Sequence, residues 1–292
     1  MQEDYVVRVV VEGTQVLGYV ASSTRLVERA RKLHRTTPIA TAALGRALTL
    51  VGILGITLKE NQRVSLQIEC QGPLEGILVQ GNAKGEVRGY VSQPWIILPS
   101  KEEGKLNVED AVGAGSKLIV VKDLGFGEPY LGSVTMPRGG IAYDLAYYFT
   151  TSEQLPSACS AGVYVGKKGK VLSAGGFIIH TPLGTSLDVI GILEENIARL
   201  GPVSQRLFSG ETPEDIAALL FDRLPYQIVG KSVLRYRCRC SRRRAKGVLL
   251  LLGENEREEL FETQGRAEVH CAFCNRTYVF VPEDFIKKRQ EE

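Results

Sequence analysis

The chain has 292 residues, of which 44% are hydrophobic and 24% are charged, and its formal net charge is +3. This length suits one sizeable domain with a smaller one, and the composition is that of a folded globular protein rather than a disordered or fibrous one. So small a net charge gives no whole-chain attraction to nucleic acid. The sequence carries neither a cleavable apolar signal nor an unbroken apolar span, so we expect a cytoplasmic protein with no membrane partner.

Residues 1–181 mix short strands and helices without strict alternation. Two apolar stretches, Tyr5–Val11 and Val16–Ala21, predict a hairpin. Apolar residues at helical spacing predict a helix over Thr24–His34, and Pro38 opens a second one, rich in Ala, Leu and Gly, from Ile39 to about Lys59. Turn residues separate further strand candidates, which are Arg63–Cys70, Gly76–Gly81, Glu86–Val91, Lys117–Asp123 and Tyr130–Pro137. We predict an α+β core domain whose sheets are mixed but mainly antiparallel, with helices.

Residues 182–230 have a helical character. Leu187–Leu200 carries one apolar face, and Thr212-Pro213-Glu214-Asp215 has the N-cap, the proline and the acidic first turn of a helix start. Helices of this length are marginal alone in water, so they need a partner surface. We therefore predict a helical linker that docks its apolar faces on another part of the protein.

Residues 231–292 form a predicted small C-terminal domain that holds most of the cysteines. Cys238 and Cys240 form a C-x-C pair, and roughly thirty residues later Cys271 and Cys274 form a C-x-x-C pair. Two close pairs at this separation are the layout of a four-thiolate zinc site, because each pair supplies two ligands from one tight turn. Four thiolates fill tetrahedral zinc and leave no position for water or substrate, which excludes a hydrolytic zinc site.

The metal should dominate the stability of this domain. A lobe of about 60 residues rarely gains more than ~3–5 kcal/mol from its core, whereas structural zinc contributes on the order of 10–16 kcal/mol. From spacing alone, three interpretations stay open. The site is a structural staple, or part of a zinc ribbon that grips nucleic acid through Ser241–Arg244, or a redox switch in which disulfide formation releases the metal. A thiol oxidoreductase using Cys271 and Cys274 lacks the usual βαβ context.

Other chemistry-bearing residues are few. Cys70 and Cys159 have no neighbouring cysteine or flanking base, so we interpret both as small buried hydrophobes. His270 adjoins Cys271, but four cysteines already complete the site and we expect this histidine to be uncoordinated. The sequence has no Walker motif, dinucleotide fingerprint, H-E-x-x-H or nucleophile elbow, and its three histidines leave few candidates for acid–base catalysis. We therefore expect that the protein is not an enzyme.

Taken in order, these residues resemble the redox-regulated thirty-three-kilodalton heat-shock chaperone family of bacteria over essentially the whole chain. The C-x-C and C-x-x-C pairs are the most specific part of the resemblance. Weaker supporting stretches are Ala43–Arg46, Gly81–Val91, Val121–Gly125, Ser152–Ser157 and Ala174–Phe177.

The resemblance implies an ATP-independent holdase chaperone that binds unfolding client proteins under oxidative or heat stress and prevents their aggregation. In that family the reduced, zinc-bound form is inactive. Carried over, oxidation would form the disulfides Cys238–Cys240 and Cys271–Cys274, release one Zn²⁺ per chain, unfold the zinc domain and the linker, and favour a homodimer. The resemblance implies no nucleic-acid partner. The alternative interpretation is a zinc-ribbon protein that binds nucleic acid.

Overall fold

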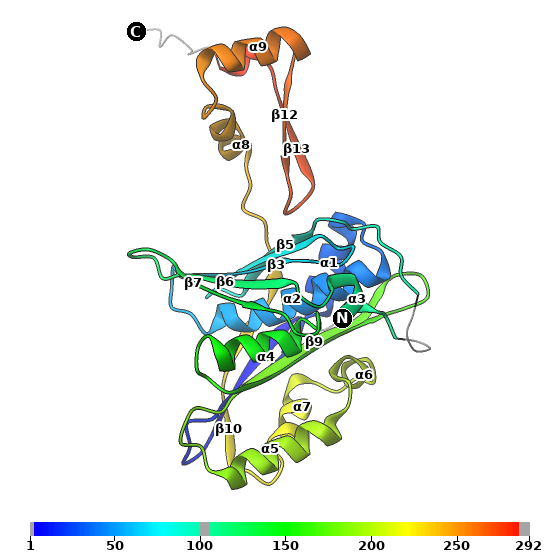
Figure 1. The fold of residues 1–292 in the computed structure, drawn as a ribbon, viewed down its shortest axis with the longest axis vertical. Coiled ribbons are helices and arrows are strands. Elements are labelled where there is room, and N and C mark those ends of the chain that lie inside the picture. Colours follow the sequence, from blue (N-terminus) through cyan, green and yellow to red (C-terminus); the bar gives the residue numbers. More distant parts are fainter. Residues whose placement is uncertain (1–2, 100–104, 286–292) are drawn as a thin grey trace. The chain divides into compact units, whose positions relative to one another are not determined.

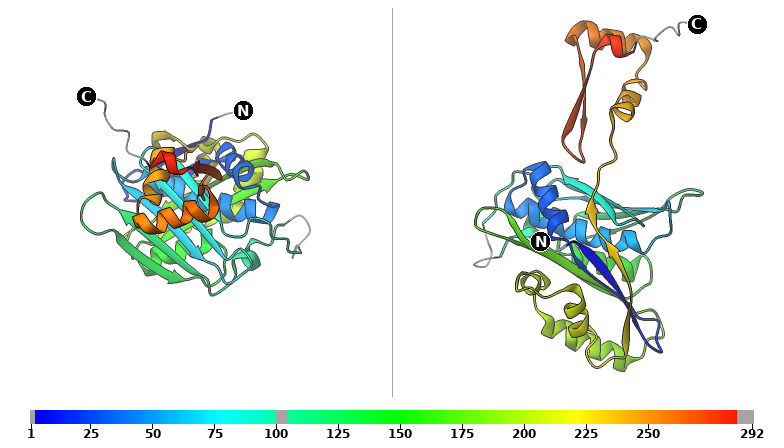
Figure 2. Two further views of the ribbon diagram at one scale, coloured as in Figure 1. Left: turned by 90° about the horizontal axis from the view of Figure 1, so that it is seen from above. Right: turned by 180° about the vertical axis from the view of Figure 1, so that it is seen from behind.

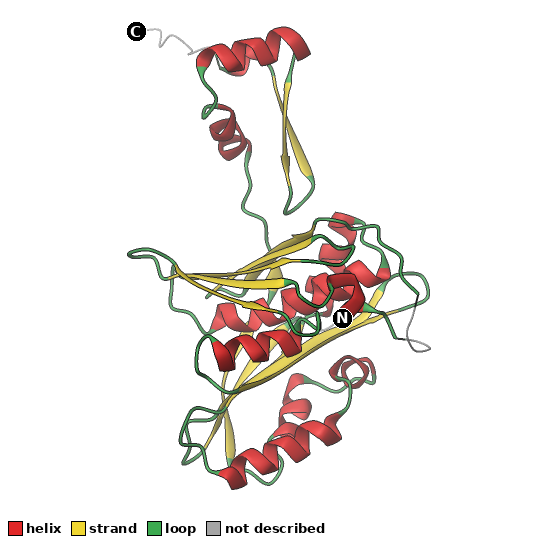
Figure 3. Cartoon of the chain, viewed as in Figure 1, coloured by secondary structure: helices red, strands yellow, loops and turns green. Residues whose placement is uncertain are grey.

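The computed structural model describes residues 3–99 and 105–285, and the chain divides into two compact units, residues 1–237 and 238–292. Both units combine helices with antiparallel strands, as Figures 1 and 3 show, so the predicted α+β class is confirmed. Within the described residues, the first unit contains two sheets and the second contains a two-stranded one. The division into core, linker and zinc domain at residues 181 and 230 stays a prediction.

The first sheet is formed by β1 (Tyr5–Val11), β2 (Leu17–Ser22), β8 (Ser157–Val165), β9 (Val171–His180) and β10 (Tyr226–Val233). Its strand order is β10-β1-β2-β9-β8, and every pair of neighbours is antiparallel. Strands β1 and β2 form the predicted hairpin. Both faces of this sheet are buried, since Val6 packs in one hydrophobic cluster and Val7 in another. Burial on both faces explains why β1 reads as a run of valines rather than as an alternating strand.

The second sheet is formed by β3 (Arg63–Glu69), β4 (Gly76–Asn82), β5 (Glu86–Val91), β6 (Lys117–Asp123), β7 (Tyr130–Thr135) and β11 (Arg235–Tyr236). Its order is β11-β5-β4-β3-β6-β7. Strand β11 runs parallel to β5, and the other pairs are antiparallel. In β3 the apolar residues alternate with polar ones, so this strand buries one face only.

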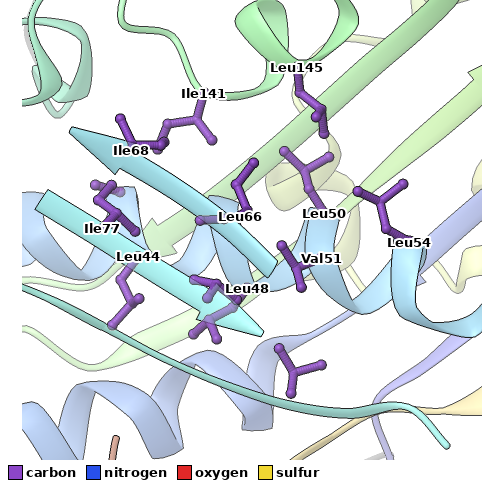
Figure 4. Packing of buried hydrophobic residues seen from close by; sticks show 14 of the residues in the cluster. Leu44, Leu48, Leu50, Val51, Leu54, Leu66, Ile68, Ile77, Ile141 and Leu145 are labelled. Atoms are coloured by element: carbon purple, nitrogen blue, oxygen red, sulfur yellow. The ribbon is translucent and has the colours of Figure 1, made fainter. Parts of the chain in front are cut away.

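The helices of the core are α1 (Thr24–His34), α2 (Pro38–Ile56), α3 (Val108–Val112) and α4 (Ala142–Thr151). Helix α2 contacts strands of both sheets and is buried on nearly all sides. Figure 4 shows its leucines, such as Leu48 and Leu50, among apolar side chains of β3, β4 and α4. The length and hydropathy of α2 would suffice to cross a membrane, but 89% of its most apolar window is buried inside the protein, as in a core helix.

The linker segment contains α5 (Leu187–Leu200), α6 (Val203–Phe208) and α7 (Pro213–Leu220). Helices α5 and α7 lie where the sequence predicts them. Helix α7 begins with a capping box, because Thr212 and Asp215 each accept a hydrogen bond from the other's backbone N–H, and Pro213 occupies the first helical position. Figures 1 and 2 show these helices on the face of the first sheet away from α2.

We call this sheet face, together with the helices that pack on it, the covered face. Its buried side chains from the sheet and its turn are Tyr5, Val7, Val9, Val11, Val16, Val20, Phe177 and Ile179. Those from the linker are Leu193, Leu200, Val203, Ile216, Ala217, Leu220, Phe221 and Leu224. The expected partner surface of the amphipathic helices is therefore the first sheet.

Strand β10 was not predicted from the sequence, since its residues span the expected boundary at residue 230 between the helical linker and the zinc domain. It is an edge strand and leaves apolar residues such as Ile228 and Val229 exposed. A bulge between Arg8 and Val9 also shifts its register against β1. An exposed, irregular edge strand has no apolar alternation by which a sequence pattern could reveal it.

The second unit contains α8 (Arg242–Leu249), α9 (Glu254–Gln264), β12 (Ala267–Cys271), β13 (Arg276–Phe280) and a 3₁₀ turn, Pro282–Asp284. Strands β12 and β13 form an antiparallel hairpin. The sequence Pro282-Glu283-Asp284 also predicts a helix start, and any continuation beyond residue 285 lies outside the described residues. Within the described part, the buried core of this unit consists of Ala245, Leu249, Phe261, Ala267 and Phe280.

Candidate metal centre

The segment that leads to the first cysteine pair is anchored to β5. The backbone N–H groups of Arg235 and Arg237 donate to carbonyls of Gly85 and Val87, both at 2.9 Å. The Glu86 carboxylate is 4% exposed and pairs with both arginine side chains, at 3.2 and 3.4 Å. The residues directly before Cys238 are thus held at a fixed position on the first unit.

The second cysteine pair lies at the tip of the β12–β13 hairpin. The carbonyl of Cys271 accepts hydrogen bonds from the N–H groups of Cys274, at 3.2 Å, and Asn275, at 2.9 Å. Asn275 adopts a φ of 54°, in the left-handed region that asparagine tolerates well. The result is a tight turn from which two sulfurs project together.

The structure brings all four predicted cysteines into one cluster. The sulfurs of Cys238, Cys240, Cys271 and Cys274 all lie within 4.8 Å of one another, and all four residues are half-buried. The Sγ atoms of Cys238 and Cys271 are 3.6 Å apart, and those of Cys240 and Cys274 are 3.3 Å apart. Tetrahedral zinc with bonds of about 2.3 Å would separate its sulfurs by about 3.8 Å. The cluster therefore has the size that a metal ion with four thiolate ligands requires.

The electrostatics of the cluster also favour a cation. Burial raises the pKa of Cys271 and of Cys274; the three neighbouring sulfurs raise that of Cys274 further, whereas for Cys271 two of them raise it and Cys274 lowers it. Burial also acts to raise the pKa of Cys240, but hydrogen bonds from Tyr278 and from the other cysteines lower it to about 7. Four thiolates this close repel one another unless a divalent cation lies among them. The donor set thus fits a thiophilic metal ion.

The other predicted residues lie outside the cluster. The ring nitrogens of His270 contact Thr277 at 3.2 Å and Asn275 at 3.3 Å. Cys70 and Cys159 pack against the main hydrophobic core of the first unit. Burial raises the pKa of the Cys70 thiol to about 12 and also raises that of Cys159, so both are unreactive thiols at neutral pH.

Sequence reasoning missed Tyr278. Its hydroxyl donates a hydrogen bond to the Cys240 sulfur at 3.1 Å. Its position in the sequence could have indicated this contact, because it follows Cys274 by four residues and lies on β13, the strand that leads away from the second pair.

Two arginines of the basic stretch after Cys240 form hydrogen bonds within the second unit. Arg242 donates to the carbonyl of Val279 at 2.8 Å and to Asp284 at 2.7 Å. Arg244 donates to the carbonyl of Arg239 at 2.7 Å. Side chains held in this way are less available to phosphates, so the arrangement adds no support to the nucleic-acid alternative.

Comparison with known proteins agrees with the fold. A family model described as "Hsp33 protein" matches residues 4–281. The "33 kDa chaperonin" of Desulforamulus reducens is 43% identical over 292 residues, which cover 99% of each chain. The one from Symbiobacterium thermophilum is 45% identical over 285 residues, which cover 97% of this chain and 96% of the relative. The crystal structure of the 33 kDa chaperonin from Thermotoga maritima matches with a TM-score of 0.86 at 36% identity, covering 97% of this chain and 96% of that one. The chain therefore belongs to the Hsp33 family of chaperones.

Proposed function

We propose that this protein is a redox-regulated, ATP-independent holdase, inactive when reduced and metal-bound and active when its four cysteines are oxidised. Membership of a chaperone family supports the chaperone part. The observation that carries the mechanism is the covered face. Detachment of α5, α6 and α7 would expose both their apolar side and that of the first sheet. Exposed apolar surface of this kind is what an unfolding client can bind.

The proposed cofactor is one Zn²⁺ per chain, with Cys238, Cys240, Cys271 and Cys274 as ligands. When bound, Zn²⁺ supplies four bonds and neutralises thiolate charge, and it has no open position for chemistry. We therefore propose no enzymatic activity. Because the described core of this unit is so small, the metal–sulfur bonds dominate its stability.

Oxidation is proposed to form a disulfide within each pair. For each bond, one thiolate attacks peroxide to give a sulfenic acid and hydroxide, and the second thiolate then displaces hydroxide from that sulfur. Two peroxide molecules thus accept four electrons from four thiolates. The short sulfur distances in the reduced cluster, 3.6 Å for Cys238–Cys271 and 3.3 Å for Cys240–Cys274, join different pairs. The family resemblance, rather than proximity, supports Cys238–Cys240 and Cys271–Cys274.

Disulfide sulfur is a poor metal ligand, so the oxidised unit loses its metal and unfolds. The chain before Cys238 runs back through β11 and β10 to α7. Once residues 238–292 are unfolded, β10 and the ion pairs of Glu86 hold the end of the linker. The stability of this attachment falls as the temperature rises. Helices of six to fourteen residues are marginal without tertiary contacts, which makes the linker a temperature sensor as well.

We further propose unfolding proteins as the clients, a homodimer as the oxidised form, and the cytoplasm as the location. Thiols stay reduced there until oxidants appear, as a resting thiolate cluster requires. Neither a nucleic acid nor a membrane is part of this proposal.

The decisive experiment follows metal and activity together. Reduced protein is treated with peroxide at raised temperature, while zinc release and the aggregation of a thermally unfolding client, such as citrate synthase, are recorded. We expect about one zinc per chain to leave as client protection appears, and a thiol reductant with added zinc to restore the inactive form. Metal loss with no gain in protection would leave the cluster as a structural staple and refute the switch.

A further inference from the structure

The two cysteine pairs differ in how their sulfurs are hydrogen bonded. In the second pair, the backbone N–H groups of Phe273 and Arg276 donate to the sulfurs of Cys271 and Cys274. Phe273 lies within the C-x-x-C turn, and Arg276 begins β13 directly after it. The C-x-C pair lies in a segment without secondary structure. The hydrogen bonds that lower the pKa of Cys240 come from side chains, with that of Tyr278 the largest.

Tyr278 supplies a side-chain donor to the first pair. Its hydroxyl donates to Cys240 Sγ at 3.1 Å. In the hairpin it lies opposite Val269, and both side chains pack against the small core of the unit. This packing restricts the ring, and the hydroxyl also interacts with the side chain of Arg276.

We propose that Tyr278 is a positioning residue of the metal centre, whose hydroxyl stabilises the thiolate of Cys240, strengthens metal binding and slows oxidation of that sulfur. A hydrogen bond donated to a thiolate withdraws electron density from sulfur, which makes it a weaker nucleophile toward peroxide. Groups that hydrogen bond to metal ligands typically contribute about 10- to 100-fold to metal affinity. The oxidation part of this inference rests on the proposed redox switch, whereas the metal-binding part does not.

The test removes the hydroxyl and keeps the ring. Zinc affinity of the reduced, full-length protein is measured by competition with a chromophoric chelator. We expect Tyr278→Phe to bind zinc about 10- to 100-fold more weakly than wild type. The matched control is Thr277→Val, which removes a hydroxyl from the adjoining residue of the same strand. Thr277 contacts His270 instead of a sulfur, so the control should bind zinc as wild type does.

A spectroscopic reading separates the hydroxyl from a merely structural effect of the ring. With Co²⁺ in place of zinc, sulfur-to-cobalt charge-transfer bands report electron density on the thiolates. We expect these bands to move to lower energy in Tyr278→Phe and to stay in place in Thr277→Val. Peroxide-driven metal release should also be several-fold faster in Tyr278→Phe.

The proposal is overturned if Tyr278→Phe keeps wild-type affinity and wild-type bands. It is equally overturned if binding weakens while the cobalt bands stay unshifted, because the substitution then acts through the folding of the unit rather than through the contact of the hydroxyl with the sulfur. The affinity and the spectrum are read without client or oxidant, so the chaperone function can fail while this inference stands. If the wild-type protein binds no metal, both fail.

Discussion

Phe221 gives the sharpest test of whether the linker acts as a removable cover. Its ring is fully buried at the end of α7 and lies on Gly18 of β2, where any added Cβ would overlap the ring. Replacing a buried phenylalanine by alanine costs about 3–5 kcal/mol, and Gly18 has no side chain with which to fill the cavity. We expect Phe221→Ala to destabilise the attachment of the linker by this amount.

A loss of that size raises the fraction of detached linker by about two to three and a half powers of ten. Reduced, zinc-loaded Phe221→Ala should therefore bind an apolar fluorescent dye and protect a client at temperatures where wild type does neither, while keeping its metal. The matched control is Leu219→Ala on the same helix, where the side chain is 40% exposed. An exposed substitution of this kind should change stability by no more than about 0.5 kcal/mol.

A single cooperative unfolding transition would refute independent detachment of the linker. If Phe221→Ala unfolds the whole first unit at once, with no dye binding or client protection before that point, the linker does not detach on its own. Amide hydrogen exchange in α5 and α7 would then match that of the sheet rather than exceed it.

Three further substitutions test other parts of the account. Cys271→Ser should weaken zinc binding and give partial client protection without oxidant, and a zinc-replete, fully inactive variant would contradict the mechanism. Glu86→Gln should loosen the chain before Cys238 by about 1–2 kcal/mol, seen as faster exchange of the Arg235 and Arg237 amides, and unchanged exchange would count against the anchor. Burial raises the pKa of Asp4 to about 6, above the ~3.9 of an unfolded aspartate, so its protonation stabilises the fold as pH falls through 6 and this gain is lost above it. The difference in the free energy of unfolding between wild type and Asp4→Asn, measured with denaturant, should therefore change by up to ~2–3 kcal/mol between about pH 4 and pH 7.5. A difference that does not depend on pH would rule this out.

Elements with a strong local pattern could be predicted from the sequence. Helix α1 has the predicted bounds, Thr24–His34, because its apolar residues repeat at helical spacing. Helix α7 starts where Thr212 and Pro213 placed it, because capping depends on neighbouring residues alone. The four cysteines of the cluster were found in the same way, since metal-ligand spacing is local to each pair.

What the sequence could not provide depends on distant partners. Strand β10 exists because β1, more than two hundred residues earlier, offers it an edge. The pairing of β11 with β5 likewise has no local signal, since two residues carry no periodicity. The contact of Tyr278 with Cys240 joins two segments that are far apart in the sequence and come together only in the folded unit.

The pairing of β1 with β10 has a consequence for how the protein is made. Residues 5–11 leave the ribosome early, but the strand that pairs with their outer edge ends at residue 233. At about 5–20 residues per second, that edge stays open for roughly 10–45 s. During this interval a valine-rich strand presents unpaired backbone groups to other nascent chains. Newly synthesised copies are therefore themselves aggregation-prone, and their yield should depend on the translation rate and on other chaperones already present.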